Sequence, residues 1–217
     1  MPAQEHPMPS LANLRTAREE FEKLEPRGFF YWSVTKLVSA VFDGEAHAAR
    51  TDELVLALMM LLTTWNRNYY RFFDSRHPGK TLEQHFADLE TQLQKHFRRL
   101  TEFRRAQIRS AQELPTGEIE GVFEDFASVL GRVGAAKCLH LLAPAFFPLW
   151  DAAILKGYGL ENAAYRGRTD AQRYVAFMGI AKAQINNLGD SSSVPANILK
   201  ALDEYNYCRF TKKVNFA

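Results

Sequence analysis

Apolar residues recur at steps of three and four along most of this chain, and no stretch alternates convincingly between apolar and polar residues. Steps of three and four place side chains on one face of an α-helix, whereas strict alternation indicates a β-strand. In the segment 11–24, for example, the apolar residues are Leu11, Leu14, Ala17, Phe21 and Leu24. We therefore predict an all-α fold, a compact multi-helix bundle.

The same periodicity, together with glycine and proline turn signals, predicts the other helices. We expect them at residues 29–42, 53–73, 81–113 (one helix or two), 119–130, 135–142, 169–188 and 194–207, with a further one beginning at Asp151. Residues 57–62 are apolar on every side, so their helix belongs at the centre of the fold. The 217 residues contain no internal repeat, and we expect one helical domain over 1–217.

Composition excludes several classes of protein. With 47% hydrophobic and 24% charged residues, the chain can build a core and is not a disordered protein. Cys138 and Cys208 are too few for a disulfide scaffold or a cysteine-based zinc site. The sequence contains no HExxH, P-loop, GxGxxG or GxSxG motif, and its six histidines are scattered. We expect no metal and no cofactor.

The distribution of apolar residues also bears on location. Residues 1–10 contain three prolines and no apolar run, so we expect no secretory leader. The longest apolar run, 54–62, is far shorter than the roughly 20 residues of a membrane span. The expectation is a cytoplasmic monomer that does not contact a membrane.

Residues 130–151 carry more than fold information. They read Leu130-Gly-Arg-Val-Gly134-Ala-Ala-Lys137, followed by an apolar connection that ends at Asp151. A helix, a turn over 131–134 and a second helix make a hairpin, and the second helix presents free N–H groups that can bind a phosphate. Lys137 stands in the first turn of that helix and Asp151 begins the next one, so an amine and a carboxylate could share one pocket.

This pattern resembles the helix-hairpin-helix DNA glycosylase superfamily, in which a Leu-Pro-Gly-Val-Gly turn precedes a helix and an Asp follows a hydrophobic connection. The greatest likeness is to the divergent branch that contains archaeal-type 8-oxoguanine glycosylases. The motif covers residues 130–154, and its helical core spans about 118–157. Lys137 lies three residues after Gly134, whereas the lysine of bifunctional members lies two residues after the last turn glycine. The matching positions are Leu130, Val133, Gly134, Lys137 and Asp151.

The resemblance implies two helical lobes flanking a cleft, and a DNA N-glycosylase with or without AP-lyase activity. The target nucleotide would rotate out of the duplex into a pocket. Asp151 would stabilise positive charge at the sugar C1′, and Lys137 would attack C1′ to form a Schiff base that permits β-elimination. The hairpin would bind the DNA phosphate at Gly131, Val133, Gly134 and Ala135.

A second candidate segment, 64–72, interleaves Asn and Arg with large aromatic residues at the end of the most apolar helix. Aromatic rings there offer stacking surfaces, and an amide could contact a base edge. Trp150 could wall the same pocket. We therefore predict a base pocket made of Trp65, Asn66, Tyr69 and Trp150.

Charge is a weaker indication of nucleic-acid binding, because the net charge of the chain is only +2. Residues 95–109 contain six Lys or Arg against one acid, and residues 205–213 interleave bases with aromatics, as in surfaces that bind a nucleic-acid strand. DNA with a damaged or modified base is the expected partner.

Each of these residues also has a purely structural interpretation. Asp151 can be a helix N-cap, Lys137 a surface lysine, the two glycines an ordinary C-cap and turn, and the aromatics core packing. His140 is better explained as a core histidine and is left out of the site. The alternative functions are a helix-hairpin-helix protein that binds nucleic acid without catalysis, and a helical protein-interaction module.

Overall fold

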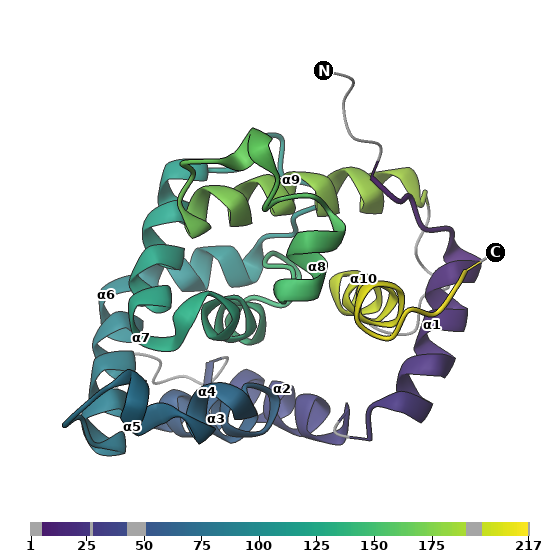
Figure 1. The fold of residues 1–217 in the computed structure, drawn as a ribbon. Coiled ribbons are helices and arrows are strands. Elements are labelled where there is room, and N and C mark those ends of the chain that lie inside the picture. The colour runs from purple at the N-terminus through teal and green to yellow at the C-terminus, as the bar shows by residue number, and fades with distance from the viewer. Residues whose placement is uncertain (1–5, 27, 43–50, 190–196, 217) are drawn as a thin grey trace.

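The computed structural model describes residues 6–26, 28–42, 51–189 and 197–216, and every regular element in these ranges is a helix (Figure 1). The predicted all-α fold is confirmed. The elements are α1 (Leu11–Leu24), α2 (Gly28–Phe42), α3 (Thr51–Trp65), α4 (Arg67–Arg71), α5 (Phe73–Arg76), α6 (Leu82–Arg105), α7 (Thr116–Leu142), α8 (Ala152–Gly157), α9 (Asp170–Asn187) and α10 (Ile198–Asn206), with short turns η2 (Ala163–Tyr165) and η3 (Tyr207–Thr211).

Capping explains why several helices begin where they do. The Ser10 hydroxyl accepts a hydrogen bond from the Asn13 N–H at 3.1 Å, and the Asn13 side chain accepts one from the Ser10 N–H at 3.0 Å. Thr81 and Thr169 form the same reciprocal pair at the starts of α6 and α9. These pairs satisfy amides that have no partner inside the helix, so they fix its first residue. The predicted segment 11–24 is confirmed residue for residue.

The prediction of one helix over 53–73 is wrong. Helix α3 ends at Trp65, Asn66 has φ −112° and ψ 35°, and a second non-helical residue, Phe72, separates α4 from α5. The hydroxyls of Thr63 and Thr64 donate to carbonyls of the preceding turn, each at 2.8 Å. Such bonds compete with the helical ladder and bend a helix. The chain therefore turns after Trp65.

The prediction of helix over all of 81–113 is also wrong beyond Arg105. Ala106 is extended, and the Ile108 N–H donates to the Ala145 carbonyl at 3.0 Å, so this stretch bonds to the 143–150 connection rather than to its own helix. The last helix begins at Ile198 rather than at 194, and residues 194–196 of that prediction lie outside the described residues.

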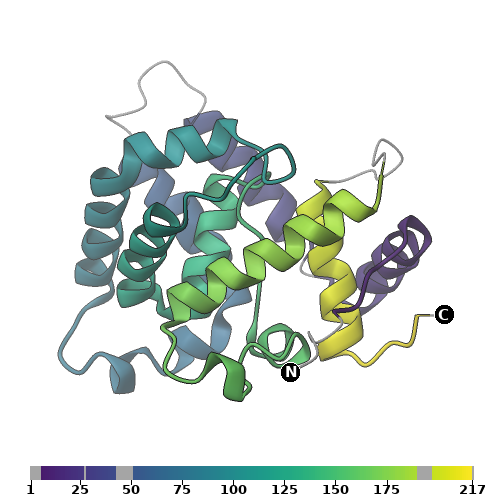
Figure 2. The same ribbon diagram turned by 90° about the horizontal axis from the view of Figure 1, so that it is seen from above.

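Helix α3 packs against α2, α6 and α7, but the prediction that residues 57–62 are enclosed at the centre of the fold is wrong. Leu54, Leu58 and Leu62 are fully buried, but Leu56 and Met60 are exposed, so one flank of α3 faces outward. Helix α7 also contacts α6 and α9. Helix α1 pairs with α10 on the opposite side of the molecule from α6, as both views show (Figures 1 and 2). The N-terminal and C-terminal helices thus face α3 and α7 from one side.

Candidate active site

The hairpin glycines each meet a steric requirement. Gly131 interrupts α7 with φ 68° and ψ 163°, a conformation essentially restricted to glycine. A Cβ on Gly134 would come within 2.9 Å of the Leu130 Cβ and 3.1 Å of the Asn66 amide nitrogen. Gly131 therefore allows the chain to change direction, and Gly134 allows α7 to approach the end of α3.

The predicted four-residue turn over 131–134 is shorter in the structure. Only Gly131 is non-helical, and Val133, Gly134 and Ala135 already belong to the second half of α7. Gly131 and Val133 are partly exposed, whereas Gly134 and Ala135 are buried. A helix that restarts after a non-helical residue has first-turn N–H groups without partners in that helix, so phosphate binding at this bend stays a prediction.

Lys137 lies two helical turns after Gly131, on the side of α7 that faces the end of α3. Its Nζ donates a hydrogen bond to the Trp65 carbonyl oxygen at 2.5 Å. Trp65 is the last residue of α3, and carbonyls in the last turn of a helix have no partner within that helix. We predicted one helix over 53–73, but α3 ends at Trp65. This unpredicted helix end supplies the carbonyl oxygen to which Lys137 donates.

Asp151 is the N-cap of α8, as its structural interpretation predicted. Its Oδ1 accepts from the Ile154 N–H at 2.8 Å, and its Oδ2 accepts from the Thr211 hydroxyl at 3.3 Å. The neighbouring Trp150 is buried and donates from its indole nitrogen to the Arg132 carbonyl at 3.1 Å. This bond ties the segment that presents Asp151 to the hairpin.

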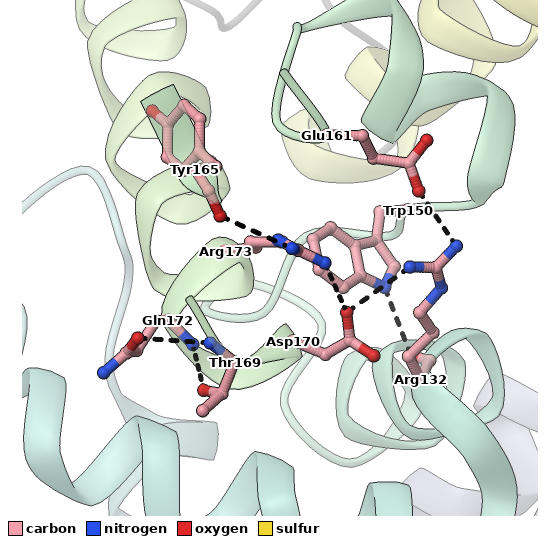
Figure 3. Close-up of polar contacts among 8 residues, drawn as sticks. All are labelled: Arg132, Trp150, Glu161, Tyr165, Thr169, Asp170, Gln172 and Arg173. Atoms are coloured by element: carbon pink, nitrogen blue, oxygen red, sulfur yellow. Dashed lines mark hydrogen bonds and ion pairs between the residues drawn. The ribbon is translucent and has the colours of Figure 1, made fainter. Parts of the chain in front are cut away.

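An ion-pair network fixes the outer side of the same hairpin (Figure 3). The Arg132 guanidinium lies 3.1 Å from Glu161 and 3.3 Å from Asp170, and Arg173 lies 3.3 Å from the same Asp170 oxygen. Asp170 is the first residue of α9, so the bend in α7 is held against the start of that helix. Arg132 is therefore engaged with acids of this chain rather than directed at the pocket.

Lys137 and Asp151 line one pocket with about 510 Å³ of space, its mouth included. Trp65 and Trp150 line the same pocket, so four of the predicted site residues, from three separate segments, meet there. The complete lining is Phe21, Glu25, Trp65, Lys137, Leu149, Trp150, Asp151, Asp203 and Tyr207.

Sequence reasoning missed the part of the lining that comes from the chain ends. Glu25 follows α1, Asp203 lies in α10, and Tyr207 begins η3. The lining therefore contains three carboxylates and one amine. Burial and the nearby Glu25 carboxylate raise the pKa of Tyr207, whose hydroxyl donates to Glu25 at 3.4 Å. The sequence feature that could have identified Asp203 as a site residue is its position as an acid within an apolar helical pattern.

The other two predicted pocket residues, Asn66 and Tyr69, do not line this pocket. The Asn66 amide faces Gly134, and the Tyr69 ring packs against Gly131. The Tyr69 hydroxyl also donates to the Val129 carbonyl at 2.6 Å. Both side chains brace the hairpin from behind, and the broken end of α3 turns them toward it.

His140 has the core role expected for it. Its Nδ1 lies 2.7 Å from the Phe147 carbonyl oxygen and must carry the proton, so its Nε2 accepts from the Tyr31 hydroxyl, also at 2.7 Å. Burial lowers the pKa of His140 to about 4. It is a neutral, fully bonded histidine beneath the pocket wall.

The two basic segments differ in their surroundings. Most cations of 95–109 are engaged within the chain: Lys95 with Asp125, Arg98 and Arg99 with Glu102, Arg104 with the Leu142 carbonyl, and Arg109 with the Gly189 carbonyl. In the C-terminal segment, the Lys212 amine lies 5.6 Å from the centre of the Tyr207 ring, which lines the pocket. Lys212 therefore lies beside one residue of the pocket lining.

Comparison with known proteins found no match to a protein-family model, to a curated protein or to a solved structure. Within the described ranges, no helix has both the length and the apolarity needed to cross a membrane. The same ranges contain no cluster of three or more His, Cys, Asp or Glu arranged to hold a metal ion.

Proposed function

We propose that the protein is a DNA N-glycosylase that excises a damaged or modified base from a nucleotide flipped into the pocket of Lys137 and Asp151. The observation that carries the proposal is the convergence of these two side chains on one pocket. Aromatic side chains, Trp65 and Trp150 among them, wall that pocket. A nucleobase is flat and stacks on such walls. The exposed Lys212, beside the Tyr207 ring of the lining, suits a phosphate backbone.

The chemistry follows from the positions of the two groups. As the C1′–N glycosidic bond breaks, the base takes the bonding electron pair and then a proton, and C1′ becomes positively charged. The Asp151 carboxylate stabilises that charge. Its two hydrogen bonds, from Ile154 and Thr211, hold it in a fixed orientation. The nucleophile that completes the reaction is either water or Lys137.

In the lysine branch, the neutral Lys137 amine donates one N–H to the Trp65 carbonyl and directs its lone pair at C1′. The new N–C1′ bond replaces the glycosidic bond, Nζ loses a proton, and opening of the sugar ring yields a Schiff base. That intermediate permits strand cleavage by β-elimination. In the water branch, Lys137 remains a cation beside the pocket and only the base is released.

The Asp151→Asn variant tests the proposal. Asparagine is also a good N-cap, so α8 keeps its start while the negative charge is lost. Base release from duplexes that each carry one oxidised, alkylated or deaminated base should fall by about 100-fold or more. DNA affinity should stay within about twofold of the wild-type protein, and borohydride in the same incubations distinguishes the lysine branch by a covalent adduct on Lys137.

The matched control is Asp52→Asn, which removes an exposed carboxylate from the first turn of α3, away from the pocket. It should leave base release unchanged. Equal base release by wild type and Asp151→Asn, or none by the wild-type protein on any duplex of the panel, would contradict the proposal. DNA binding without base release favours the second candidate, a non-catalytic helix-hairpin-helix protein, for which the capping role of Asp151 is the supporting observation.

A further inference from the structure

The segment from α8 to the first turn of α9 carries positive charge that the chemistry above does not use. Residues 152–173 contain four cations and two acids: Lys156, Arg166, Arg168, Arg173, Glu161 and Asp170. This local excess of two positive charges equals the net charge of the whole chain, +2. Figure 2 shows the segment in green at an outer edge of the molecule. Its free charge depends on which cations the two acids engage.

Both acids are engaged by arginines that hold the segment against the hairpin bend. Arg132, beside that bend, lies 3.1 Å from Glu161 and 3.3 Å from Asp170. Arg173 lies 3.3 Å from the same Asp170 oxygen and donates to the Tyr165 carbonyl oxygen at 3.4 Å. Figure 3 shows the two arginines meeting at the Asp170 carboxylate. Two arginines thus face two acids, and neither acid is left to neutralise the other cations.

Two of those other cations are presented by a tight turn. Arg166 has φ −61° and ψ 132°, and Gly167 has φ 81°. The Arg168 N–H donates to the Tyr165 carbonyl oxygen at 3.2 Å, which closes the turn. This geometry is a type II β-turn, whose third residue needs a positive φ and is therefore usually glycine. The turn places Arg166 and Arg168 on either side of Gly167, so both guanidinium groups leave one short, hydrogen-bonded segment.

These two arginines keep their full charge at the surface. Both are exposed, and within the described residues neither forms an ion pair with an acid. The central carbon of the Arg168 guanidinium lies 4.9 Å from the centre of the Tyr165 ring. A contact of this kind restricts the side chain without neutralising it. The turn therefore presents two ordered cations to solvent.

A phosphate backbone is the partner that fits this surface. The planar guanidinium group of arginine pairs with phosphate oxygens through two N–H groups at once. A protein partner is disfavoured, because the centre of a protein interface is apolar and none of the large apolar side chains that the described residues expose lies in 152–173. The Arg132 network also ties the turn to the bend at which phosphate binding is predicted.

We propose that the turn of residues 165–168 binds the phosphate backbone of the DNA strand that passes the hairpin bend, with Arg166 and Arg168 as the phosphate ligands. Its service to base excision rests on the proposed function, whereas DNA binding by the turn does not. Contacts to phosphate carry no sequence information. The turn therefore adds affinity for any duplex and leaves the choice of base to the pocket.

The salt dependence of DNA binding tests the inference without catalysis. Each phosphate that a cation neutralises contributes about 0.9 to the slope of log affinity against log salt concentration. Fluorescence anisotropy of a short labelled duplex of undamaged sequence gives this slope for the wild-type protein and for the double variant Arg166→Gln/Arg168→Gln. The slope of the variant should be shallower by about 1.8, and its affinity in about 0.1 M salt should be roughly 10- to 100-fold weaker.

Two results would overturn the inference directly: an unchanged slope in the double variant, or no binding of the duplex by the wild-type protein. A charge-preserving variant, Arg166→Lys/Arg168→Lys, separates charge from structure and should keep the wild-type slope. A slope as shallow as that of the glutamine variant would contradict a contact made through charge.

The matched control is Arg98→Gln in α6, which removes an arginine whose side chain is 96% exposed from the other basic segment, 95–109. It should leave the slope unchanged. A comparable loss of slope per arginine removed would contradict the assignment of the contact to the turn.

The inference and the proposed glycosylase fail separately. In saturating DNA the double glutamine variant should release the base at the wild-type rate, because the pocket is intact and only the DNA concentration that it needs has risen. A shallower slope in a protein that releases no base contradicts only the glycosylase. Base release together with an unchanged slope contradicts only the role given to Arg166 and Arg168.

Discussion

Asp151 and Lys137 each combine a structural contact with a place at the pocket wall. The cap hydrogen bond of Asp151 contributes about 1 kcal/mol to helix stability and also fixes the direction of the carboxylate. The hydrogen bond from Lys137 to the Trp65 carbonyl holds the amine near the end of α3. The structural and functional interpretations of these residues are therefore compatible, because positioning is what a catalytic group needs.

His140 supports a prediction at the same scale. Its pKa is lowered to about 4 by burial, below the value of roughly 6.5 in an unfolded chain. Between these values the unfolded state binds the proton and the folded state does not, so stability is complete above about pH 6.5 and falls as the pH drops toward 4. The free energy of unfolding should decrease by about 1 kcal/mol per pH unit from this group.

Urea unfolding at pH 7 and pH 5 measures this dependence. His140→Asn keeps an N–H donor for the Phe147 carbonyl but removes the titrating ring. This variant should be less stable than wild type at pH 7, yet lose less stability on going to pH 5. An identical pH dependence in both proteins would show that His140 does not titrate between its folded and unfolded values as its burial requires.

At the scale of the element, the bend in α7 is the feature on which the site depends. Gly131 redirects the chain, Gly134 lets α7 touch the end of α3, and Arg132 anchors the bend to α9. The sequence predicted a hairpin from two glycines around Val133, but it placed four residues in the turn. Only Gly131 leaves the helix, because Gly134 serves close packing instead.

Alanine substitutions separate these two uses of glycine. Gly131→Ala should reduce the free energy of unfolding by about 1–3 kcal/mol, because its backbone conformation is essentially closed to other residues. Gly179→Ala, at an exposed interior position of α9 with open space around it, should raise stability by about 0.5–1 kcal/mol. Thermal or urea unfolding of both variants checks the pair, and a stabilising Gly131→Ala would contradict the geometry of the bend.

Helix boundaries could be predicted from the sequence where hydrogen bonds between neighbouring residues determine them. The capping pairs at Ser10, Thr81 and Thr169 fix helix starts from residues only three apart, and those starts agree with the predictions within one residue. The ends of α3 and α6 were predicted too far along the chain. There, contacts with distant segments, such as the bond from Ile108 to Ala145, outweigh the local preference for helix.

At the scale of the molecule, the candidate pocket is lined by residues from the N-terminal and C-terminal helices together with residues from α3 and α7. Helix α1 pairs with α10 (Figure 1). This pair brings Glu25 and Asp203 to the pocket that Lys137 and Asp151 line. Local spacing could predict the lysine and the aspartate, because they belong to one hairpin. It could not predict Glu25 or Asp203, because only packing between the first and last helices places them there.

The central claim is that Lys137 and Asp151 act together on one flipped nucleotide. A crystal structure of the Asp151→Asn protein bound to a duplex with its substrate base tests this most directly. The account predicts the nucleotide outside the duplex, with its C1′ about 3–3.5 Å from the Lys137 Nζ or from a water held beside it, and facing residue 151. A nucleotide that stays stacked in the duplex, on DNA that crosses a face remote from Lys137, would contradict it.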